Sequence, residues 1–132
     1  MRYSSTGRYH YYTKWIIVSC DEDLARYYRN LVNQYSRSIE LQKPMHGSHI
    51  TVIAGKYELF PYPRYELWKK YDGQEVMFEY DTYVHTDGIY YWLTVYCPEF
   101  EKVRLELGLN ATTPMPWHLT IGNLKHEIKK SS

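Results

Sequence analysis

The sequence Pro116-Trp117-His118-Leu119-Thr120-Ile121-Gly122 decides how the rest of the chain is interpreted. Its pattern of histidine, apolar residue, threonine and apolar residue occurs once more, within Ser48-His49-Ile50-Thr51-Val52-Ile53. Successive side chains of a β-strand point to opposite faces, so residues two apart share a face. Each copy therefore presents an imidazole beside a hydroxyl and turns its apolar residues to the other face. Two such strands side by side would combine four polar side chains in one site: His49, Thr51, His118 and Thr120.

The composition is that of one domain spanning residues 1–132, with a net charge of only +1. A near-neutral chain argues against binding long nucleic acid through a broad basic surface, although a small phosphate ligand remains compatible with it. Sixteen residues are tyrosine, whose flat face and hydroxyl suit both sheet surfaces and pockets for planar rings. The sequence has no apolar run of bilayer length and no disulfide framework, so we expect a cytoplasmic protein with reduced thiols and no membrane partner.

The first half of the chain shows an alternation of strand and helix patterns. We expect an irregular lead-in over residues 1–10, a buried strand over 11–20 and an amphipathic helix over 21–36. The cap of this helix is either Asp21 or an S-x-x-E box that runs from Ser19 to Glu22. A short strand at residues 39–41 then precedes the first motif strand.

The second half repeats that mixture with clear turn signals. A short helix is expected over residues 64–71, followed by strands over 75–84 and 89–96 that turn at Asp87-Gly88. Pro98 starts a further helix, the second motif strand comes next, and the polar tail from residue 125 is expected to fray.

One histidine-x-serine or histidine-x-threonine match is a weak signal by itself. A third match, His46-Gly47-Ser48, reads as loop because Gly47 and Pro44 interrupt the strand pattern. The other two both lie in β-prone segments with apolar residues at the alternate positions, and each half of the chain holds one. A tyrosine-rich interaction domain with two coincidental motifs is the structural alternative.

Paired imidazoles can cleave a phosphodiester without a metal or another cofactor. An imidazole titrates near pH 6.5, so one ring can be neutral while the other is protonated. One would deprotonate a water or a ribose 2′-hydroxyl, and the other would protonate the leaving oxygen. The threonine hydroxyls would donate to the non-bridging oxygens, where negative charge builds. The sequence does not decide which histidine is the base, and it shows no pattern of metal ligands.

Candidate substrate-binding residues are aromatic or basic side chains close to these strands in sequence. Rings could stack on nucleobases, and a lysine could support a phosphate. The candidates are Tyr12, Trp15, Lys56, Trp92 and Trp117.

With its two motifs about 70 residues apart, residues 13–124 of the chain resemble the 2H phosphoesterase superfamily, which includes LigT-like RNA cyclic phosphodiesterases. The size and the motif spacing are most similar to phage anti-CBASS phosphodiesterases, which destroy cyclic oligonucleotide signals of bacterial defence. The resemblance implies an α+β, bilobal fold: two pseudo-symmetric antiparallel sheets flanked by helices, with a central cleft. It also assigns catalysis to His49 and His118, and phosphate binding to Thr51 and Thr120.

The function implied by this resemblance is metal-independent hydrolysis of cyclic di- or trinucleotide second messengers, such as cyclic GMP-AMP, in the cytoplasm of a phage-infected host. Two alternatives stay open: opening of RNA 2′,3′-cyclic phosphate ends or other RNA-end processing, and a non-catalytic sponge that sequesters a cyclic nucleotide. The expected partner is a cyclic oligonucleotide substrate, and neither long nucleic acid nor a membrane is expected as a partner. The oligomeric state is not indicated by the sequence.

Overall fold

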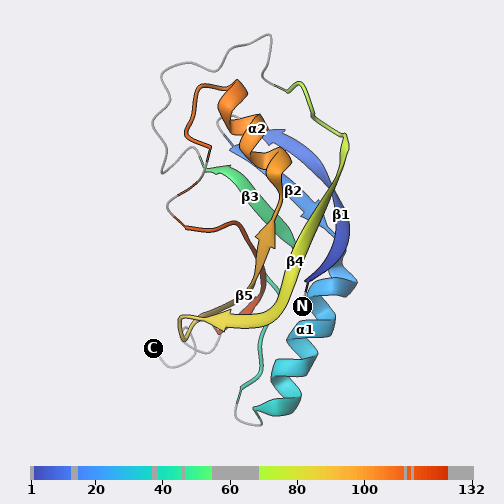
Figure 1. Ribbon diagram of the computed structural model, residues 1–132. Coiled ribbons are helices and arrows are strands. Elements are labelled where there is room, and N and C mark those ends of the chain that lie inside the picture. Colours follow the sequence, from blue (N-terminus) through green and yellow to red (C-terminus); the bar gives the residue numbers. More distant parts are fainter. Residues whose placement is uncertain are drawn as a thin grey trace.

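The computed structural model describes residues 2–12, 15–36, 39–45, 47–54, 69–111, 113 and 115–124. Its strands form one closed antiparallel barrel in the order β1-β2-β3-β6-β5-β4 (Figure 1). The strands are β1 (Arg2–Tyr12), β2 (Trp15–Cys20), β3 (His49–Ala54), β4 (Glu75–Thr86), β5 (Tyr90–Tyr96) and β6 (His118–Asn123). Two helices complete the described part of the chain, α1 (Glu22–Tyr35) and α2 (Pro98–Glu106). None of the described helices is long and apolar enough to cross a lipid bilayer.

The predicted bilobal α+β fold with two separate sheets is wrong, because all six strands belong to one barrel. Strand β1 closes it by pairing with strands of both halves: Gly7 pairs with Cys20 of β2 and with Val76 of β4. Residues 2–10 were expected to be irregular, yet they form most of this strand. The strand was not predicted because its sequence is polar, and the sequence is polar because residues such as Arg2, Tyr3 and Ser4 are exposed on the outside of the barrel.

The element order repeats: β1-β2-α1-β3 in the first half and β4-β5-α2-β6 in the second. The last strands of the two units, β3 and β6, lie side by side in the barrel. The helices lie at opposite ends of the barrel, with α2 at the top and α1 at the bottom of Figure 1. Phe100 of α2 and Ala25 of α1 are both fully buried, so each helix contributes to the core inside the barrel.

The predicted helix over residues 21–36 is confirmed, and Asp21 is its cap. Asp21 Oδ1 accepts a hydrogen bond from the Asp23 backbone N–H at 2.9 Å. The alternative S-x-x-E box is not formed, because the Glu22 carboxylate binds Ser48 instead. The predicted hairpin and the helix from Pro98 are confirmed as β4, β5 and α2. The short strand expected at residues 39–41 is reduced to a single bridge between Gln42 and Asn123.

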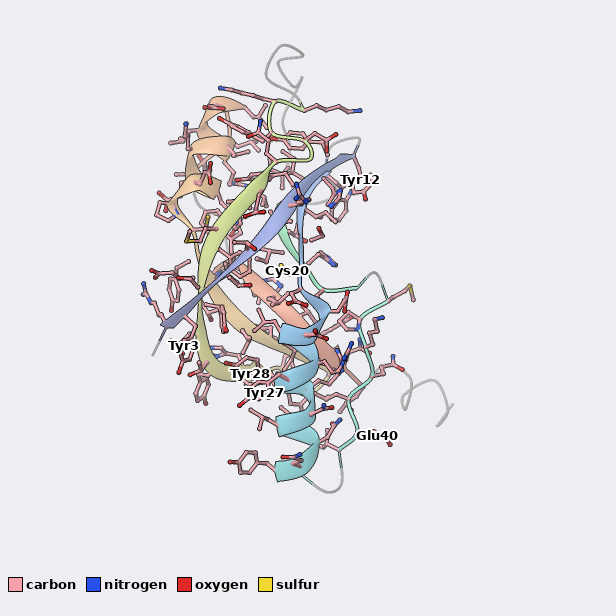
Figure 2. All side chains as sticks on the ribbon, turned by 90° about the vertical axis from the view of Figure 1, so that its right-hand side faces the viewer. Tyr3, Tyr12, Cys20, Tyr27, Tyr28 and Glu40 are labelled. Carbon is pink, nitrogen blue, oxygen red and sulfur yellow. The ribbon has the colours of Figure 1, made fainter. Side chains whose placement is uncertain are left out.

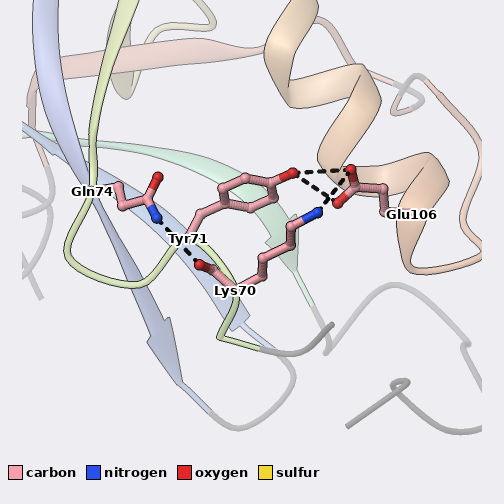
Figure 3. A network of polar contacts seen from close by, with 4 residues as sticks. All are labelled: Lys70, Tyr71, Gln74 and Glu106. Atoms are coloured by element: carbon pink, nitrogen blue, oxygen red, sulfur yellow. Dashed lines mark hydrogen bonds and ion pairs between the residues drawn. The ribbon is translucent and has the colours of Figure 1, made fainter. Parts of the chain in front are cut away.

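A polar network ties the turn before β4 to helix α2 (Figure 3). The Tyr71 hydroxyl lies 2.9 Å from both carboxylate oxygens of Glu106, and Lys70 Nζ lies 3.6 Å from Glu106 Oε1. The Tyr71 ring also contacts the buried ring of Tyr9 on β1. Most of the predicted helix over residues 64–71 lies outside the described residues, and its end belongs to the turn over 69–73.

Candidate active site

The two motif strands meet at the pair Ile50 and Leu119, which oppose each other in the antiparallel ladder between β3 and β6. Both side chains are fully buried in the core. The residues on either side of each must then point to the outside of the barrel. These residues are His49, Thr51, His118 and Thr120, and all four are partly exposed. We call them the His/Thr quartet.

The antiparallel register determines which members of the quartet face each other. Continued by one residue on either side of the Ile50–Leu119 pair, it sets His49 opposite Thr120 and Thr51 opposite His118. Side chains directly opposite have Cβ atoms about 4.5–5.5 Å apart, and diagonal neighbours about 7–8 Å apart. In this continued register the two histidines would be the diagonal pair, and a tetrahedral phosphate between them could contact both imidazoles and both hydroxyls.

Both imidazoles are oriented by the same local contact. His49 Nδ1 lies 3.1 Å from the Gly47 carbonyl oxygen, and His118 Nδ1 lies 3.1 Å from the Pro116 carbonyl oxygen. A carbonyl oxygen only accepts hydrogen bonds, so Nδ1 must carry the proton in each contact. The neutral ring then has its lone pair on Nε2, as a general base requires, and the protonated ring can donate from Nε2.

A β-bulge follows the threonine in each motif strand. On β3, Thr51 pairs with Ile17 and Ile53 with Ile16, so Val52 is an extra residue. On β6, Thr120 pairs with Trp92 and Gly122 with Tyr91, so Ile121 is the extra residue. A bulge bends its strand and re-aims neighbouring side chains, and bulges are frequent beside active sites. The two halves thus share the motif and also this departure from regular pairing.

A buried arginine binds the carbonyl of each bulge residue, and it comes from the helix of the other half. Arg29 of α1 donates from Nη1 to the Ile121 carbonyl oxygen at 2.8 Å. Arg104 of α2 donates from Nη1 to the Val52 carbonyl oxygen at 3.1 Å. The exposed fractions of these arginines are 9% and 2%. Because a buried carbonyl without a donor is costly, these contacts stabilise the bulges that position Thr51 and Thr120.

The loop before His49 is fixed by the Glu22 carboxylate. Glu22 Oε1 accepts from the Ser48 backbone N–H at 2.8 Å, and Oε2 accepts from the Ser48 hydroxyl at 3.1 Å. The N–H bond is the main reason that the pKa of Glu22 is lowered. Gly47, with φ of +77°, supplies the carbonyl that orients His49, and a Cβ there would lie 2.7 Å from Glu22 Oε1. Glu22 therefore helps to place the His49 ring.

Replacing Glu22 by glutamine is expected to lower the free energy of unfolding at pH 7 by about 1 kcal/mol, because the amide nitrogen cannot accept from Ser48. A lowered folded-state pKa gives stability that is present above the ordinary pKa and lost as pH falls through the folded value. The difference in the free energy of unfolding between wild type and E22Q should therefore become smaller below about pH 4. Urea unfolding at pH 7 and pH 3 measures it, with E40Q, an exposed carboxylate, as the control. An equal E22Q deficit at both pH values would contradict the charge-assisted bond.

The structure places two of the predicted substrate-binding residues in one pocket beside His49. This pocket has a volume of about 450 Å³ and is lined by Tyr12, Trp15, Ile17 and His49. Tyr12 is 56% exposed at the end of β1 remote from Tyr3 (Figure 2).

The other three predicted substrate-binding residues have different surroundings. The Trp92 ring centroid lies 6.1 Å from that of His118, so Trp92 adjoins the quartet. Trp117 is only 8% exposed and packs edge-on against Phe100, with the ring centroids 5.4 Å apart. Trp117 therefore belongs to the core rather than to the surroundings of the quartet. Lys56 lies outside the described residues.

Three polar residues near the quartet were not predicted from the sequence. Ser19 pairs with His49 across β2 and β3, and Thr94 pairs with His118 across β5 and β6. His10 on β1 lies with its Nε2 2.9 Å from the Ser19 hydroxyl. The alternation of side chains within each strand could be predicted from the sequence, but the strand partners and the register could not. Among the described residues, no group of three or more histidine, cysteine, aspartate or glutamate side chains is arranged to hold a metal ion.

Comparison of the chain with protein-family models, with curated proteins and with solved structures gave no match.

Proposed function

We propose that this protein is a 2H-type phosphodiesterase that cleaves a small nucleotide substrate at the His/Thr quartet. The observation that carries the proposal is the matched orientation of two imidazoles on one exposed face, each with Nδ1 held by the carbonyl two residues earlier. This leaves both Nε2 atoms available for proton transfer at one phosphate. The relation to the 2H phosphoesterases rests on the two motifs and their facing arrangement, since the bilobal architecture is not present.

The proposed reaction is an in-line displacement at phosphorus. Nε2 of the neutral histidine takes the proton from a water or a ribose 2′-hydroxyl, whose oxygen forms the new P–O bond. Nε2 of the protonated histidine gives its proton to the leaving ribose oxygen as the old P–O bond breaks. Thr51 and Thr120 donate to the non-bridging oxygens, which carry more negative charge in the transition state. The two rings exchange protonation states, and solvent restores them.

The proposed substrates are cyclic di- or trinucleotides, and the proposed role is phage counter-defence against cyclic-oligonucleotide signalling in the host cytoplasm. The near-neutral charge of the chain favours a compact ligand over long RNA. The pocket of about 450 Å³ that Tyr12 and Trp15 line beside His49 supports a planar base next to the reacting phosphate.

The proposal is tested by incubating the protein in EDTA with a panel of cyclic dinucleotides, cyclic trinucleotides and oligoribonucleotides with 2′,3′-cyclic ends. Products are followed by chromatography. We expect conversion of at least one cyclic di- or trinucleotide to a linear product, with the rate unchanged by EDTA. Turnover of the oligoribonucleotides alone would assign RNA-end processing instead. Stoichiometric binding of a cyclic nucleotide that denaturation releases unchanged would assign a sponge, and loss of turnover in EDTA would refute the metal-independent mechanism.

A further inference from the structure

A row of aromatic rings leads away from His118 over the outer face of the second half. His118 contacts Trp92 edge-on, with ring centroids 6.1 Å apart. Trp92 and His85 oppose each other across β5 and β4, and their rings are nearly parallel at an interplanar angle of 17°. Tyr83 lies two residues earlier on the same face of β4, and its ring centroid is 4.8 Å from that of His85. We call Tyr83, His85 and Trp92 the aromatic row.

The aromatic row is on the surface rather than in the core. Trp92 and His85 are partly exposed, and Tyr83 is 67% exposed. The residues on either side of Trp92 in β5 have the opposite orientation, since Tyr91 and Leu93 are buried. Rings of this size on an outer sheet face leave apolar area in contact with water, which a flat ligand could cover.

We propose that the aromatic row is a nucleobase-binding surface, on which a base attached to the phosphate at the quartet stacks. The inference rests on the proposed function and names a base subsite of the same site. The inference is supported by the contact between the aromatic row and the quartet. Trp92 contacts the ring of His118 and is also the cross-strand partner of Thr120, so the row begins at the proposed phosphate position. Stacking on aromatic rings tolerates every base, because each base has a π-face.

This base subsite lies on the opposite side of the quartet from the pocket beside His49. That pocket is formed by β1, β2 and β3 of the first half, whereas the row is formed by β4 and β5. A phosphodiester held between the two histidines would therefore have one aromatic surface toward each of the two nucleosides that it joins. The substrate class that fits both surfaces is a dinucleotide unit with a base on each side of the scissile phosphate.

The test compares the binding of adenosine 5′-monophosphate with that of ribose 5-phosphate, which lacks the base, by titration calorimetry or NMR. Wild type should bind the adenosine compound more tightly than the base-free one. W92L and Y83L should each weaken only adenosine 5′-monophosphate binding, by roughly 5- to 150-fold for Trp92 and less for the more exposed Tyr83. Y35A is the matched control, since Tyr35 is an 88% exposed aromatic residue on α1 and belongs to no part of the site.

The result separates this inference from the proposed function. Equal wild-type affinity for the two probes, or adenosine 5′-monophosphate binding that W92L and Y83L leave unchanged, would overturn the base subsite even in an active phosphodiesterase. Selective weakening in W92L and Y83L would support the subsite even if no cyclic nucleotide is turned over, in which case only the proposed catalysis fails.

Discussion

Substitution of His49 or His118 by alanine is expected to lower kcat by about 10²- to 10⁴-fold each, because in the proposed mechanism each ring moves one proton in the transition state. The double variant should be little slower than the worse single one, since the two rings act on one step. Both rings are partly exposed on the barrel surface, so neither change should affect the thermal unfolding midpoint strongly. Steady-state kinetics on the best substrate of the panel measures the effect, with Y35A as the control for activity.

The same variants can assign the acid and the base. A p-nitrophenyl leaving group departs without a proton, so a substrate that carries it should restore much of the rate in the variant that lost the general acid. It should not help the variant that lost the base, which added imidazole should rescue instead. Near-normal turnover of the natural substrate by either H49A or H118A would refute the catalytic assignment.

Substitution of Arg104 by methionine is expected to lower the free energy of unfolding by about 2–4 kcal/mol. Arg104 is 2% exposed and donates to two backbone carbonyls, Val52 at 3.1 Å and Asn110 at 2.7 Å. Its loss leaves the buried Val52 carbonyl without this donor, which costs about 1–3 kcal/mol, and also removes the bond to the exposed residue Asn110, which contributes about 1 kcal/mol. Because the Val52 carbonyl belongs to the bulge after Thr51, kcat should also fall at temperatures where the variant is folded.

Urea unfolding measures this loss, and R26M is the matched control. Arg26 lies on α1 and makes an exposed ion pair with Asp23, which should contribute less than about 1 kcal/mol. R104K tests the geometry, since a lysine keeps the charge but cannot reproduce both directions of the guanidinium. If R104M were as stable as R26M, the bulge would not depend on the buried arginine.

Features set by local periodicity were predictable from the sequence. The helix after Asp21, the turn at Asp87-Gly88 and the side-chain directions in the motif strands all follow from residues close together in the chain. His49 and Thr51 share a face because side chains alternate along a strand, so the polar face of each motif strand could be predicted without knowing the fold.

Features set by pairing between distant segments were not predictable. Residues 2–8 pair with 75–81, and their polar sequence carries no sign of that partner. The closure of the barrel, and hence the failure of the bilobal prediction, depends on this pairing. The bulges at Val52 and Ile121 depend on the register of neighbouring strands. Nothing in the sequence near Arg29 or Arg104 indicates a carbonyl 92 or 52 positions away.

The exchange of arginines between the halves has a consequence for how the protein folds and how it can be divided. Arg29 belongs to the first β-β-α-β unit and binds the second, whereas Arg104 belongs to the second and binds the first. Either unit expressed alone would bury a bulge carbonyl without its arginine donor. Unfolding of one unit therefore removes a support of the other, and the protein should unfold in a single cooperative transition. The His/Thr quartet would assemble only in the last step, when both units have closed on each other.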